Sequence, residues 1–230
     1  MTRLFIAILI SVCCFSAAHA QIVDVEQSEK FNTDSVLRDF DNRPFFGIYK
    51  DNYFVGGTSI GTKPTSHNSD VKFQVSISQR LTKSVLPFNT YAFLFYSQKC
   101  MWNVFEKSLP MRDFNFNPGL GFTKLLISKN RLVGKLTLMI EHESNGRDKM
   151  YDRSWNKLSF AGNIYLTPNL MIHGKYWLTY IDSKQNKDIL RYNGIYQTGI
   201  QVLSPNQRWV FSATFVKRKG WNLNGNTIVD

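Results

Sequence analysis

A histidine and a serine stand two residues apart at the end of a strand-like stretch, within Ile140-Glu141-His142-Glu143-Ser144-Asn145-Gly146. Side chains on a β-strand alternate between its two faces, so His142 and Ser144 share one face with Leu136, Leu138 and Ile140. An imidazole can take the proton of a hydroxyl that attacks an ester carbonyl. A base and a nucleophile in line with aliphatic side chains suit chemistry on lipid at a membrane surface.

The next strand-like segment begins at Ser154 and brings an asparagine to the same face. Asn156 has the parity of Leu158, Phe160 and Ile164. Antiparallel neighbours place such residues side by side, so we expect Asn156 to meet His142 and Ser144 outside the sheet, near its rim. The alternatives are chance surface residues for the histidine and serine and a turn residue for the asparagine.

The elements that position these residues are predicted to follow an export signal. Arg3 supplies a positive charge, Leu4 to Val12 an apolar stretch, and Ala18-His19-Ala20 a cleavage site. We therefore expect a signal peptide over residues 1–20, a periplasmic segment over 21–46 and a barrel domain over 47–230. Cys13 and Cys14 belong to the signal, and Cys100 is expected to pack as a small hydrophobe without a disulfide partner.

The chain is basic, with 28 Lys and Arg against 17 Asp and Glu and a net charge of +11. An exported chain is an improbable nucleic-acid binder, so we expect no nucleic-acid partner. Attraction to an anionic lipid surface fits the charge better. A well-solvated surface is the simpler alternative.

The chain alternates polar and apolar residues in repeated stretches and contains no apolar stretch long enough for a membrane helix. The clearest stretch is Val71 to Arg80, and a short helix is a candidate near Ser35 to Phe40. Turn-forming residues separate the other predicted strands. These strands begin near Gly47, Thr90, Asn117, Val133, Ser154, Leu170, Ile189 and Trp209.

Strands of roughly nine to fourteen residues suit a tilted crossing of a membrane. A soluble β-sandwich produces the same alternation, so the period alone does not decide. Aromatic residues toward the strand ends, as in an interfacial girdle, favour the membrane. We therefore predict an all-β, antiparallel transmembrane barrel in the outer membrane, with nine to ten strands and an incomplete C-terminal part.

The combined motif His142-Glu143-Ser144-Asn145-Gly146 and Arg153-Ser154-Trp155-Asn156 resembles the active-site pattern of outer membrane phospholipase A. The resemblance extends from about Ser35 to the end of the chain. Flanking pieces agree with it, namely Arg43-Pro44-Phe45 with Asp51-Asn52-Tyr53, Val71 to Ser76, and Tyr96-Ser97-Gln98-Lys99 with Trp102. It implies a twelve-stranded, calcium-dependent acyl hydrolase that converts phospholipids to lysophospholipids and fatty acids.

The resemblance also implies roles for individual residues. Ser144 would be the nucleophile, and His142 would take its proton and later protonate the leaving alcohol. Asn156 would hold the imidazole in the useful tautomer. The backbone N–H of Gly146 would help to stabilise the oxyanion.

A calcium site shared by two subunits is implied in the same way, and with it a homodimer on activation. Its ligands would be the Arg147 carbonyl, Asp152 where family members carry serine, Asp182, and Ser108 from the neighbouring subunit. Asp148 is a further candidate. Solvated loop carboxylates are the alternative for Asp148 and Asp152, and a plain loop hydroxyl for Ser108.

Two other functions fit the same sequence. One is a barrel without enzymatic activity, either a pore or a structural protein. The other is an inactive, truncated member of the family, because a sheet with open edges is poorly suited to lipid.

Overall fold

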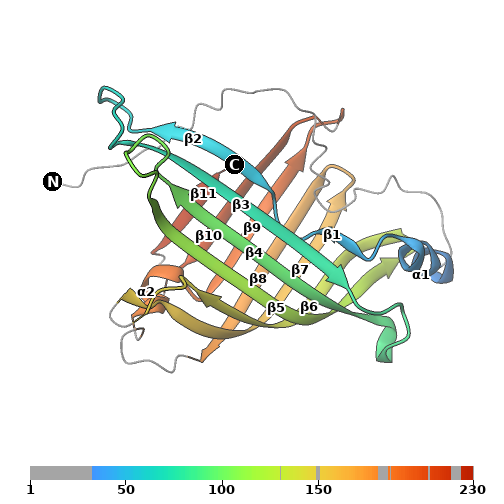
Figure 1. Ribbon diagram of the computed structural model, residues 1–230. Coiled ribbons are helices and arrows are strands. Elements are labelled where there is room, and N and C mark those ends of the chain that lie inside the picture. The colour runs from blue at the N-terminus through green and yellow to red at the C-terminus, as the bar shows by residue number, and fades with distance from the viewer. Residues whose placement is uncertain are drawn as a thin grey trace.

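The computed structural model describes residues 33–129, 131–148, 151–180, 186, 188–206, 208–218 and 224–229. Its described part is one antiparallel sheet of eleven strands with two α-helices and one 3₁₀ turn (Figure 1). The predicted signal peptide lies outside the described residues. Among the described residues, no helix is long and apolar enough to cross a membrane.

The elements follow one another along the chain with mostly short connections. Their bounds are α1 Thr33–Asn42, β1 Phe46–Ile48, β2 Tyr53–Thr58, β3 Ser69–Arg80, η1 Pro87–Asn89, β4 Thr90–Trp102, β5 Met111–Ser128, β6 Arg131–Ser144, β7 Ser154–Thr167, β8 Leu170–Tyr180, α2 Ile189–Asn193, β9 Tyr196–Leu203, β10 Val210–Lys217 and β11 Gly225–Val229.

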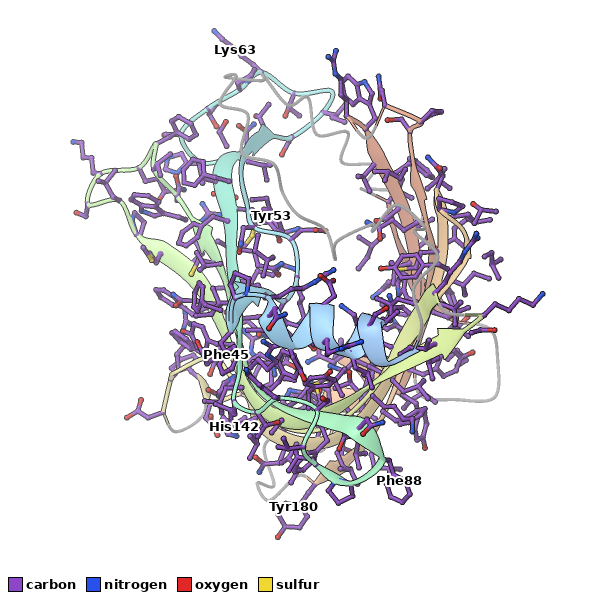
Figure 2. All side chains as sticks on the ribbon, turned by 90° about the vertical axis from the view of Figure 1, so that its right-hand side faces the viewer. Phe45, Tyr53, Lys63, Phe88, His142 and Tyr180 are labelled. Atoms are coloured by element: carbon purple, nitrogen blue, oxygen red, sulfur yellow. The ribbon has the colours of Figure 1, made fainter. Side chains whose placement is uncertain are left out.

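From β3 onward each strand pairs with the next one in the chain, through to β11. β1 and β2 both pair with β3, β1 at its end and β2 along its beginning. The strands curve around a common axis, and α1 lies across the end that faces the viewer in Figure 2. Within the described residues no pairing joins β11 to β1 or β2. The prediction of an all-β, antiparallel fold of the barrel type is confirmed.

The two faces of the sheet have opposite character. Large apolar side chains such as Ile140, Leu178 and Phe122 are more than half exposed on the outer face. Glu141, Lys157 and Ser159 are buried on the inner face. A soluble sandwich would bury the apolar face, so this arrangement favours a sheet whose outer wall meets lipid.

Charges on the inner face are paired. The Glu141 carboxylate lies 2.7 Å from the Lys175 ammonium and accepts a hydrogen bond from Ser159. The Glu143 carboxylate lies 2.5 Å from the Lys157 ammonium. Buried charges need partners of opposite charge. These two ion pairs therefore allow β6 to carry two carboxylates on its inner face, while His142 and Ser144 lie on its outer face.

Helix α1 is fixed to the sheet by the buried guanidinium of Arg80. Arg80 donates to the carbonyl oxygens of Phe40, Asp41 and Arg43, at or just beyond the C-terminal end of the helix. Cations are favoured there because the free carbonyls carry partial negative charge. The Arg80 guanidinium also lies 4.4 Å from the centre of the Phe45 ring.

Three predicted strand positions were wrong. The strand predicted at Ile189 is the helix α2, because Ile189 packs with Trp155 and Trp177 in a small core, and β9 begins only at Tyr196. The single strand predicted near Gly47 is divided into β1 and β2. β5 begins at Met111 rather than near Asn117, because its first residues already pair with the end of β4.

Candidate active site

His142 and Asn156 are direct cross-strand partners in the antiparallel pair β6–β7. The imidazole Nδ1 of His142 lies 2.9 Å from the carboxamide Oδ1 of Asn156. A carboxamide oxygen only accepts hydrogen bonds, so Nδ1 carries the proton and Nε2 offers its lone pair. This is the tautomer that a general base needs.

The site lies on the outer, apolar wall of the sheet. Asn156 pairs on its other side with Tyr180 of β8, which is 67% exposed and projects away from the barrel (Figure 2). Ile140 and Leu158, themselves cross-strand partners, lie next to the site on the same face. An imidazole in this position meets molecules that approach from the lipid side.

Ser144 is the last residue of β6 and shares the outer face with His142. Its cross-strand partner is Ser154, and the Ser154 hydroxyl lies 3.4 Å from Nε2 of His142. Within the described residues no hydrogen bond joins Ser144 to His142. Nε2 of His142 therefore contacts Ser154 and not Ser144. The sequence analysis gave Ser154 no role, although Ser154 has the same parity as Asn156 and so lies on the same face.

The loop after Ser144 is held together by the buried carboxamide of Asn145. Its Nδ2 donates to the Tyr151 carbonyl at 2.8 Å, and its Oδ1 accepts from the backbone N–H groups of Arg147 and Arg153 at 3.3 and 3.0 Å. Gly146 follows with φ +66°, a backbone conformation that favours glycine. The N–H of Gly146 thus belongs to a loop whose two ends are tied together.

The predicted calcium ligands are spread around this loop. Arg147 and Asp148 are exposed and line, with Gly146 and Tyr151, a hollow of about 480 Å³. Asp152 is half-buried nearby in the chain. Asp182 lies outside the described residues.

Ser108 is exposed, with φ +69°, in the loop between β4 and β5. This loop is at the same end of the sheet as Gly146, because the beginning of β5 pairs with the end of β6.

These candidate ligands offer carbonyl, carboxylate and hydroxyl oxygens, and calcium prefers oxygen ligands. No group of three or more His, Cys, Asp or Glu side chains converges in the part of the chain that the structure describes. One copy of the described chain therefore offers a suitable but sparse set of ligands.

Contacts between loop residues hold the segment around Ser108 in place. The sequence analysis did not predict them. Glu106 lies 2.9 Å from the imidazole Nδ1 of His67 and 3.1 Å from the Arg112 guanidinium. The hydrogen bond with His67, followed by Arg112, lowers the pKa of Glu106 below its ordinary value. His67 lies in a polar loop, and the sequence pattern there predicts no role for it. Its contact with Glu106 is seen only in the folded chain.

Comparisons with known proteins identify the family. A family model described as Phospholipase A1 matches residues 36–223. The phospholipase A1 of Klebsiella pneumoniae is 26% identical over 213 residues, covering 85% of this chain and 74% of that protein. The phospholipase A1 of Proteus vulgaris is 30% identical over 151 residues, covering 62% of this chain and half of that protein.

Two solved structures show the same fold. The outer membrane phospholipase A from Escherichia coli superposes with a TM-score of 0.66 at 24% identity, covering 79% of this chain and 77% of that one. The Salmonella typhi outer membrane phospholipase dimer with bound calcium gives a TM-score of 0.67 at 23% identity, covering 88% and 83%.

Proposed function

The chain belongs to the phospholipase A1 family, and on that premise we propose that it hydrolyses acyl ester bonds of phospholipids in the outer membrane. The products would be a lysophospholipid and a fatty acid. The observation that carries the proposal is the hydrogen bond between His142 and Asn156 on the lipid-facing wall, with Ser144 on the same face.

The family resemblance predicted from the motifs is confirmed, because a family model described as Phospholipase A1 matches residues 36–223. The place in the outer membrane is part of our proposal, and the fold shared with the outer membrane phospholipase A from Escherichia coli supports it. The activity of this chain itself remains our proposal, because the alignments cover half of one curated relative and about three-quarters of another. The division into residues 1–20, 21–46 and 47–230 likewise stays a proposal.

In the proposed reaction, the Ser144 hydroxyl attacks the ester carbonyl while Nε2 of His142 takes its proton. The carbonyl oxygen becomes an oxyanion, which the backbone N–H of Gly146 stabilises. Collapse of this intermediate expels the lysophospholipid alkoxide, which receives the proton from His142. Water then hydrolyses the acyl-enzyme by the same route, with Asn156 holding the imidazole throughout.

The Ser154 contact adds one requirement to this reaction. Ser154 occupies the hydrogen-bonding position at Nε2, so the Ser144 hydroxyl must replace it before the attack. We propose that a change of side-chain rotamer at the two serines makes this exchange.

We propose calcium as the cofactor and a homodimer as the active form. The Arg147 carbonyl and Asp152 would hold the ion, with Ser108 of a second copy and with Asp182 or Asp148 as further ligands. A bound calcium ion would supply positive charge near the oxyanion. The sparse ligand set of one copy supports a site completed by another chain.

Fatty acid release from mixed micelles of phospholipid and detergent tests this function on refolded protein. We expect release by the wild type, loss of more than about a thousandfold in Ser144→Ala, and no change in Ser128→Ala, an exposed serine at the opposite end of β5. A folded wild type without activity, or an active Ser144→Ala variant, would contradict the proposal. Activity that survives EDTA would remove calcium from it while leaving the serine chemistry.

A further inference from the structure

The ring of Phe116 covers the glycine that is proposed to bind the oxyanion. Phe116 of β5 is the direct cross-strand partner of Ser144 of β6, so both side chains stand on the outer face. A Cβ atom added to Gly146 would lie only 2.9 Å from Cε2 of this ring and 3.5 Å from Cδ2. The Phe116 ring thus occupies the space that a side chain at position 146 would need.

The Phe116 ring is itself held in place. It stacks on the ring of Phe114, with 5.7 Å between ring centres and 8° between ring planes. Phe114 lies two residues earlier on the same strand and the same face. Neighbouring aromatic rings of this kind stabilise one another beyond the area they bury, so the stack favours this orientation of the Phe116 ring.

Gly146 is itself exposed, but its backbone has neighbours on two sides. On one side, buried Asn145 ties the loop through Tyr151, Arg147 and Arg153. On the other side, the Phe116 ring fills the space next to Gly146. A change in the backbone at Gly146 would redirect its N–H, and it would have to occur against these two contacts.

We propose that Phe116 is a positioning residue that fixes the Gly146 N–H for oxyanion stabilisation. This inference rests on the proposed function and deepens it. Donors that stabilise a developing charge are effective because they are oriented before the reaction begins. Phe116 contributes nothing to the reacting atoms directly, and it acts only through the glycine it contacts.

The central test replaces Phe116 by Leu, with Phe122→Leu as the matched control. Phe122 lies on the same strand and the same face and is exposed, but its cross-strand partner is Leu138, so Phe122→Leu removes the same kind of ring without touching the Phe116–Phe114 stack or Gly146. We expect Phe116→Leu to lower kcat about tenfold or more with little change in KM, and Phe116→Tyr, which keeps the ring, to remain close to wild type. A heat-dependent change in gel migration verifies that each variant has folded. If Phe116→Leu does not fold, the same measurements are made on Phe116→Met.

A second measurement separates positioning from a structural role. An alkyl boronic acid forms a tetrahedral adduct with a nucleophilic serine and so resembles the intermediate. Its inhibition constant should rise in Phe116→Leu by about the factor by which kcat/KM falls. Both quantities depend on the oxyanion donor. An unchanged inhibition constant beside a reduced kcat/KM would overturn the proposal.

The contact with Gly146 can also be tested by a double-mutant cycle. In the wild type, Gly146→Ala forces a methyl group against the ring, whereas in Phe116→Leu that obstacle is gone. We therefore expect Gly146→Ala to cost less activity in the Phe116→Leu background. Strictly additive losses would overturn the proposal.

The outcomes distinguish this inference from the function on which it rests. An inactive, folded wild type contradicts the proposed phospholipase activity. An active wild type with equal kcat values for Phe116→Leu and Phe122→Leu leaves the activity in place and overturns only the role of Phe116.

Discussion

Nδ1 of His142 lies 2.9 Å from Oδ1 of Asn156, and the two residues are cross-strand partners in β6 and β7. The orientation of the imidazole therefore depends on the register of one strand pair. A shift of one residue in that register would turn Asn156 to the inner face.

Removal of the Asn156 carboxamide should leave the imidazole unoriented. We expect Asn156→Ala to lower kcat by about a hundredfold, because the useful tautomer of His142 loses its hydrogen bond. Asn156→Asp, which keeps an acceptor at the same place, should retain most of the activity. Equal losses in the two variants, measured by fatty acid release, would argue against an orienting role.

Covalent labelling can distinguish which of Ser144 and Ser154 is the nucleophile. A long-chain sulfonyl fluoride should modify Ser144 and leave Ser154 free, as mass spectrometry of the digested protein would show. Because the Ser154 contact with Nε2 is long, at 3.4 Å, we expect Ser154→Ala to change kcat less than about fivefold. Label found on Ser154 would reverse the assignment of the nucleophile.

The ion pair of Glu141 and Lys175 predicts a stability effect inside the sheet. Glu141 is 2% exposed, and Lys175→Met would leave its carboxylate without its nearest cation. We expect the free energy of unfolding to fall by about 3 kcal/mol. Adding Glu141→Gln should recover much of the loss in a urea titration, and no recovery would mean that the damage is steric.

Arg80 should control the attachment of α1. Arg80→Leu removes hydrogen bonds to three carbonyl oxygens, and we expect limited proteolysis to cut within residues 33–45 while the strands stay protected. Arg208→Leu, at an exposed turn, is the control. Equal resistance of the two variants would show that α1 is held by other contacts.

The loop that carries Ser108 should respond to acid. The pKa of Glu106 is lowered from 4.5, chiefly by the hydrogen bond with His67 and then by Arg112, which also faces Asp70 at 3.6 Å. A carboxyl group with a lowered pKa stabilises the fold above its ordinary pKa, and this contribution is lost as the pH falls through the lowered pKa.

Trp102 can report this transition, because its indole N–H donates to the Leu109 carbonyl in the same loop. We expect its fluorescence, identified by comparison with Trp102→Phe, to change below pH 4.5 in the wild type and not in Glu106→Gln. The same acid transition in Glu106→Gln would assign it to another group.

The sequence by itself determined the faces and the family. Alternation is a local property, so the parity of Ser144, His142 and Asn156 placed all three on one face before any contact was known. The combined motif of His142 to Gly146 and Arg153 to Asn156, with its flanking pieces, carried the family resemblance, and regular alternation located most of the strands.

Only the tertiary structure decided which atoms meet. Alternation cannot distinguish a sandwich from a barrel, and the exposed apolar wall with its paired inner charges made that distinction. The contact of Ser154 with His142, the ring of Phe116 against Gly146 and the bond of His67 to Glu106 all join different strands or loops. Such contacts depend on inter-strand register and on side-chain rotamers, neither of which is encoded in the local period of the sequence.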